Sequence, residues 1–111
     1  MGLDKPEEVD AIGIEDATGV AVLTIADSWD WEEEGEHLLA LQAKLNSYFE
    51  FIESGQVWES YPGAQGRDLV IEIVTRFPLP GVAEELVHRA SEASSDLGVQ
   101  IRIRHYSGST E

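Results

Sequence analysis

The segment from Trp31 to Ser54 carries apolar residues at the three- and four-residue spacing of an α-helix. A helix of that length would extend about 36 Å, with an apolar stripe along one side. Asp30, followed three residues later by Glu33, predicts a capping box at its start, and Gly55 predicts its end. The stripe consists of Leu38, Leu41, Leu45, Tyr48, Phe49 and Ile52. Because a helix with one apolar side must pack against another layer, this helix is expected to be the main packing element.

Shorter apolar and β-branched segments predict the other layer. The predicted strands are residues 9–14, 20–25, 56–61, 69–76 and 99–104, and a second helix is predicted over residues 82–97. The first two strands flank turn residues and predict a β-hairpin, and the next two predict another. The predicted order is β-β-α-β-β-α-β. This order favours an α+β fold in which one mostly antiparallel five-stranded sheet has two helices packed on one face.

The sheet face that the helices leave free is expected to mix charged and apolar side chains. It would present Glu72, Arg76, Arg102, Arg104 and Tyr106 beside Val70 and Val74. Such a mixture suits either solvent or self-association, so a homodimer is one prediction.

The organisation along the chain indicates one domain. Residues 1–8 are interpreted as a polar leader, residues 9–106 as the single α+β domain and residues 107–111 as a short polar tail. The absence of cysteine excludes a disulfide framework, a thiolate metal site and a cysteine nucleophile. No targeting pattern and no apolar run of membrane-spanning length occurs in the sequence, so we expect a cytoplasmic protein with no membrane partner.

The formal net charge of −15 limits the classes of partner. Residues 1–66 hold 15 acidic residues against Lys5 and Lys44, a net charge of −13, and residues 67–111 hold 7 against 5 arginines. The phosphates of nucleic acids would be repelled by this charge, which favours a basic protein as the partner. The alternative is that the acidic surface serves solubility alone.

The densest group of chemically active residues lies in residues 27–37, which combine carboxylates, two tryptophans and an imidazole. Glu33 and His37 have the i,i+4 spacing that can chelate a metal, and Asp30 is the third candidate ligand. Acidic residues are also expected at a helix start because they interact favourably with the helix dipole. Trp29 and Trp31 could line a ligand groove or form the hydrophobic contact at the helix entry. We predict no cofactor.

Several short segments resemble a family of small bacterial proteins that is catalogued only as a domain of unknown function. They are Asp10-Ala-Ile-Gly, Val22-Leu-Thr-Ile, Asp30-Trp, Glu36-His-Leu-Leu, Leu41-Gln-x-Lys-Leu-Asn-x-Tyr48, Phe51-Ile-Glu-Ser-Gly-Gln56 and Glu59-Ser-Tyr-Pro62. The resemblance covers residues 4–76 and implies no activity, cofactor or catalytic residue.

Two hypotheses follow from these observations. The first is a non-enzymatic interaction module, with an immunity or antitoxin-like role as a special case, that binds a basic partner. Its candidate contact residues are Trp29, Asp30, Trp31, Glu32, Glu33 and Glu36. The second is a metal-dependent enzyme or small-ligand binder that uses Asp30, Glu33 and His37. Whether the chain is an enzyme is left open, with the first hypothesis favoured.

Overall fold

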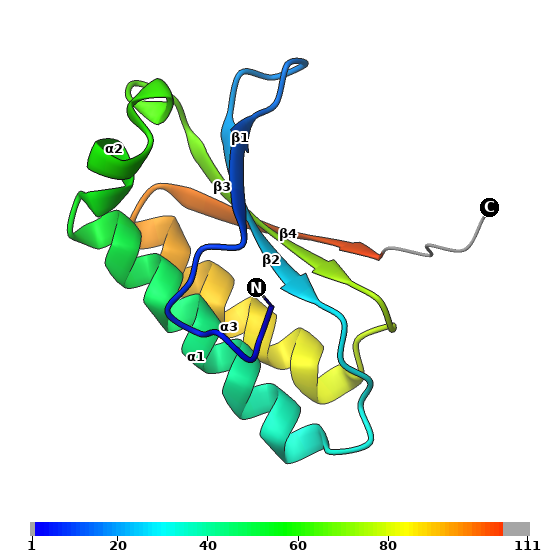
Figure 1. Cartoon of the computed structure of the whole chain (residues 1–111). Helices are drawn as coiled ribbons and strands as arrows, with labels where there is room; N and C mark the ends of the chain where they lie inside the picture. Colours follow the sequence, from blue (N-terminus) through cyan, green and yellow to red (C-terminus); the bar gives the residue numbers. More distant parts are fainter. Residues whose placement is uncertain (1, 106–111) are drawn as a thin grey trace.

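The computed structural model describes residues 2–105 (Figure 1). The strands are β1 (Ala11–Ile14), β2 (Ala21–Asp27), β3 (Leu69–Thr75) and β4 (Val99–His105), and the helices are α1 (Glu34–Glu53), α2 (Gln56–Ser60), the 3₁₀ turn η1 (Pro62–Ala64) and α3 (Gly81–Asp96). Tyr106 and the predicted tail, residues 107–111, lie outside the described residues. Within residues 2–105, no helix has both the length and the apolarity that a membrane span requires.

The four strands form one mixed sheet in the order β1-β2-β3-β4. The predicted first hairpin is confirmed, because β1 and β2 pair antiparallel with Ile12 opposite Leu23. The remaining pairs are parallel, with Leu23 beside Ile71 and Ile71 beside Ile101. The fold is therefore α+β, but the prediction of a mostly antiparallel five-stranded sheet is wrong. Each parallel neighbour is reached through a helix, α1 or α3, that returns the chain to the starting end of the sheet.

The predicted strand at residues 56–61 is helical. Gly55 adopts a left-handed conformation with φ of 83°, and α2 begins at the next residue. Helical hydrogen bonds follow, including the one from the Tyr61 amide to the Val57 carbonyl at 2.9 Å. Val57 is fully buried. β3, the strand expected to pair with this segment, is already paired on both edges, by β2 and β4. Burial of Val57 favours the helix over the β propensity of the segment.

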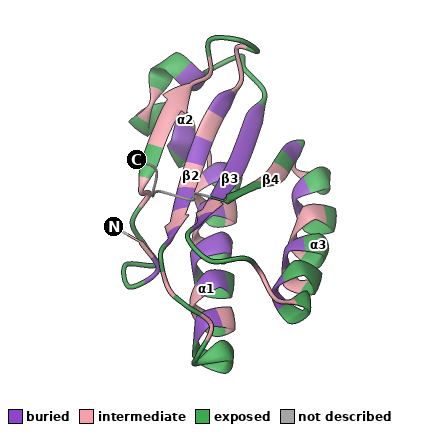
Figure 2. Cartoon of the chain, turned by 90° about the vertical axis from the view of Figure 1, so that its right-hand side faces the viewer, coloured by how far each residue is buried: buried purple, intermediate pink, exposed green. Residues whose placement is uncertain are grey.

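The two long helices cover one face of the sheet, as predicted, with α1 beside α3 (Figure 1). The core lies between this face and α1, where β2 and β3 contribute their inward residues (Figure 2). Leu23, Ile25, Ile71, Ile73 and Leu41 are fully buried there. In α3 the buried positions are Ala83, Val87 and Ser94, whereas Leu86 and Ala90 pack half-buried against the core and Val82 is exposed.

The opposite sheet face carries a charged network. Arg102 binds Glu15 with a distance of 2.7 Å and Glu72 with a distance of 2.8 Å, and Arg104 lies 3.5 Å from Glu72. The hydrogen bond from Arg102 holds the pKa of Glu15 below its usual value. Val70, on the same face, is buried. The predicted mixture of charged and apolar residues is therefore present, and Glu15, Glu72, Arg102 and Arg104 pair with one another within the chain.

Candidate functional site

The loop between β2 and α1 positions most of the residues that the sequence singled out. Helix α1 begins at Glu34, three residues later than predicted, and its N-cap residue Glu33 makes no side-chain capping bond. The Asp30 carboxylate instead accepts the amide hydrogen of Glu32 at 3.1 Å. The predicted capping box is therefore wrong. The later start of the helix has a physical cause. Nδ1 of His37 lies 2.8 Å from the carbonyl oxygen of Asp30, and this hydrogen bond keeps residues 30–33 in a turn before the helix.

His37 and Asp27 form a buried pair beneath this loop. Asp27, the last residue of β2, has two carboxylate oxygens 2.7 and 2.6 Å from Nε2 of His37. The exposed fractions of the two residues are 3% and 1%. Nδ1 of His37 donates to the Asp30 carbonyl, which can only accept, so a second hydrogen must lie between Nε2 and Asp27. Burial raises the pKa of the Asp27 carboxyl, and the hydrogen bond from His37 opposes this shift.

The two tryptophans enclose the His37 ring. Trp31 stacks on it with 3.5 Å between ring centroids and 14° between planes, and Trp29 lies tilted with its centroid 5.5 Å away. Nε1 of Trp31 is buried without a hydrogen-bond partner among the described residues. Both indole rings therefore contact an internal side chain, the role expected of a hydrophobic contact at a helix entry.

The candidate metal ligands Asp30, Glu33 and His37 are not brought together as side chains. Both ring nitrogens of His37 are occupied, one by the Asp27 carboxylate and one by the main chain of Asp30. Glu33 approaches His37 only through a main-chain hydrogen bond. Among residues 2–105, no group of three or more histidine, aspartate and glutamate side chains is placed to hold a metal ion.

The carboxylates around the start of α1 form what we call the acidic surface. It consists of Asp30, Glu32, Glu33, Glu34 and Glu36, all of which are exposed. No lysine or arginine of the described chain pairs with any of them. Leu39, one turn further along α1, is 68% exposed, the largest exposed fraction among the big apolar residues described. The acidic surface thus has free charges and an adjacent apolar side chain.

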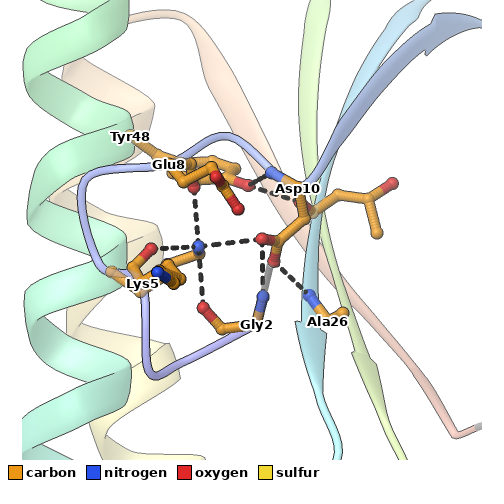
Figure 3. A network of polar contacts seen from close by, with 8 residues as sticks. Gly2, Lys5, Glu8, Asp10, Ala26 and Tyr48 are labelled. Atoms are coloured by element: carbon orange, nitrogen blue, oxygen red, sulfur yellow. Dashed lines mark hydrogen bonds and ion pairs between the residues drawn. The ribbon is translucent and has the colours of Figure 1, made fainter.

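Sequence reasoning did not identify Lys44, whose ammonium contacts four hydrogen-bond acceptors. Figure 3 shows the carbonyls of Gly2, Lys5 and Glu8 and the carboxylate of Asp10 pointing to one centre. Nζ of Lys44 lies at that centre, with distances of 2.9, 2.7, 2.6 and 2.9 Å to these four acceptors. Lys44 is fully buried. The ammonium therefore fastens the segment predicted as a polar leader to the middle of α1.

Asp10 and Tyr48 complete this network. Asp10 accepts the amide hydrogens of Gly2 at 2.8 Å and of Ala26 at 2.9 Å. The bond to Ala26 extends the bonding of β2 past Ala11, the first residue of β1. The hydroxyl of Tyr48 donates to the Thr24 carbonyl and accepts from the Asp10 amide. Burial raises the pKa of that hydroxyl. The network joins the N-terminal segment, β2 and α1.

The sequence contains a signal for both buried sites, the Lys44 network and the Asp27–His37 pair. Lys44 follows Leu41 by three residues and precedes Tyr48 by four, which places it on the apolar stripe of the helix. Asp27 continues the inward series of Leu23 and Ile25 along β2. A charged residue at an inward position requires a partner, because buried charges are rare unless paired.

Comparison with known proteins identifies a family and no activity. The model of a family of unknown function (DUF6572) matches residues 1–107. No curated protein and no solved structure gives a significant match.

Proposed function

This chain belongs to a family of unknown function (DUF6572), and we propose that it is a non-enzymatic protein-interaction module whose acidic surface binds a basic protein partner. One observation carries the proposal. The five carboxylates of the acidic surface are exposed and have no basic partner in the described chain. On the open sheet face, which the helices do not cover, Glu15 and Glu72 instead pair with Arg102. Unpaired charges of one sign accelerate and orient association with a partner of opposite sign.

The buried pair beneath the surface supports a binding role over catalysis. Asp27 and His37 have the residue types of a general acid and base, but both are buried and satisfied by each other. A catalytic base must reach a proton of its substrate, and neither group is open to one in this arrangement. The pair and the stacked Trp31 instead hold the loop that displays Asp30 and Glu32.

Leu39 supplies the apolar contact that such an interface needs. Charges at the rim of an interface mainly set the association rate, whereas buried apolar anchors contribute most of the affinity. Leu39 lies three residues after Glu36 on α1 and is therefore on the same side of the helix. Trp29 and Trp31 contact His37 and so support the loop that carries Asp30 and Glu32. Neutralisation of a basic toxin is one role that this arrangement fits, and self-association through the open sheet face is a separate proposal.

An affinity experiment tests the proposal. The tagged protein is incubated with lysate of its own organism, washed at increasing salt concentrations, and the retained proteins are identified by mass spectrometry. We expect a basic protein in a fixed ratio that moderate salt releases. The variant Glu32→Lys, Glu33→Lys, Glu36→Lys should lose this partner.

The matched control is Glu84→Lys, Glu85→Lys, Glu92→Lys, which replaces three exposed acidic residues of α3. Both triple variants change the formal net charge from −15 to −9. Circular dichroism verifies that both are folded. Equal loss of the partner in the two variants would mean that total charge, not the acidic surface, attracts it.

A further inference from the structure

A hollow lies at the other end of α1, where the N-terminal segment crosses the helix. Its volume is about 440 Å³, within the range of small-ligand pockets. Glu7 and Val9 form one wall, and Ser47, Glu50 and Phe51 from α1 form the other. The wall from the N-terminal segment is held in place by the bonds from Lys44 to the carbonyls on either side of Glu7.

The lining of the hollow combines negative charge with apolar surface. The carboxylates of Glu7 and Glu50 are exposed and pair with no lysine or arginine of the described residues. The half-buried side chains of Val9 and Phe51 belong to the same lining, with Val9 two residues after Glu7 and Phe51 directly after Glu50. The nearby ammonium of Lys44 does not cancel this charge, because Asp10 neutralises it at 2.9 Å.

We propose that this hollow binds a guanidinium or ammonium group carried on a short aliphatic chain. Two carboxylates on opposite walls can accept charge-assisted hydrogen bonds from such a cation. Its methylene groups would pack on Val9 and on the ring of Phe51, as the stems of lysine and arginine do on apolar surfaces. The net charge of −13 in residues 1–66 disfavours an anion as the ligand.

This site is independent of the acidic surface. Glu50 lies fourteen positions after Glu36 on α1, which corresponds to about 21 Å along the helix. The cation can be a free amine or a side chain of a protein, and only the protein side chain has peptide groups next to it. A free amine and a short peptide that carry the same cationic group therefore distinguish the two sources.

Nuclear magnetic resonance titration of the full-length ¹⁵N-labelled protein tests the proposal. The probes are agmatine, a free guanidinium amine, and acetyl-Gly-Arg-Gly-amide, and glutarate serves as the anionic control. We expect amide shifts at Ser47, Phe51 and Ser54 with a Kd of about 1 mM for at least one cationic probe, and none with glutarate. Tighter binding of the peptide would assign the cation to a protein side chain, and tighter binding of agmatine would assign it to a free amine.

Two variants of equal charge establish the location. Glu7→Gln, Glu50→Gln should raise the Kd about tenfold, whereas Glu32→Gln, Glu36→Gln should change it by less than about twofold. Absence of saturable shifts with both cationic probes overturns the proposal, and so does an equal effect of the two variants. Neither result decides the proposal for the acidic surface, whose own test measures retention of a basic protein after charge reversal at Glu32, Glu33 and Glu36.

Discussion

Replacement of Lys44 with methionine should remove the strongest polar link between the N-terminal segment and α1. Methionine has a similar length and no donor, so the three carbonyls lose their partner and Asp10 keeps a buried charge. Breaking a buried ion pair from one side costs about 3–5 kcal/mol, and the separate hydrogen bonds do not add to this value. The loss is large compared with the roughly 5–15 kcal/mol that stabilises a typical domain.

Urea unfolding followed by tryptophan fluorescence measures this loss. With a slope of about 1.5 kcal/mol per molar urea, the midpoint should fall by about 2–3 M. Lys5→Met is the matched control, since the Lys5 side chain is exposed and only its carbonyl contacts Lys44; its free energy of unfolding should change by less than about 0.5 kcal/mol. In Lys44→Met, hydrogen exchange should accelerate at the amides of Asp10 and Ala26, which belong to the network.

The double variant Lys44→Met, Asp10→Asn separates charge from packing. If the stranded carboxylate causes the loss, the double variant should be more stable than the sum of the two single variants predicts. A loss below about 1 kcal/mol in Lys44→Met, or one equal to that of Lys5→Met, would refute this account of the network.

Three further outcomes are expected. Burial raises the pKa of the Asp27 carboxyl, so the stabilisation from this group is complete below about pH 3.9 and is lost as the pH rises through the folded-state pKa. The free energy of unfolding of the wild type relative to Asp27→Asn should therefore fall with increasing pH. Parallel profiles of urea midpoint against pH for the two proteins would contradict this. Leu39→Ser should weaken partner binding about fivefold in a titration while the melting temperature stays within about 2 °C, because the side chain is exposed. Arg102→Met should cost about 1 kcal/mol or less in urea unfolding, because 40% of that side chain is exposed; a loss as large as that of Lys44→Met would show that the pairs with Glu15 and Glu72 are not surface pairs.

The elements with a strong local pattern were predictable from the sequence. The stripe from Leu38 to Ile52 identified α1, and the alternation from Val99 to Ile103 identified β4. The turn residues before Val20 identified the hairpin of β1 and β2. These predictions depend on neighbours within a few residues, so hydrophobic periodicity is enough to make them.

For the candidate site, the sequence predicted which residues would gather but not the contacts between them. The sequence indicated that the carboxylates near Trp31 would gather at a helix start, and they do lie there. It did not indicate that His37 turns inward to Asp27, because that bond depends on where β2 ends relative to α1. The i,i+4 spacing of Glu33 and His37 brought their main chains together, while the side chain of His37 found a partner on another element.

The tertiary structure alone decided the pairing of distant elements. Residues 56–61 have the composition of a strand, yet they form a helix because β3, their expected partner, is paired on both edges and Val57 is buried in the core. The parallel order of β2, β3 and β4 and the four acceptors around Lys44 likewise join residues 30 or more positions apart. Local sequence determines which backbone conformations are favourable. A buried charge or a sheet edge, in contrast, is stabilised by a group from a distant part of the chain, and only the tertiary structure determines which group lies next to it.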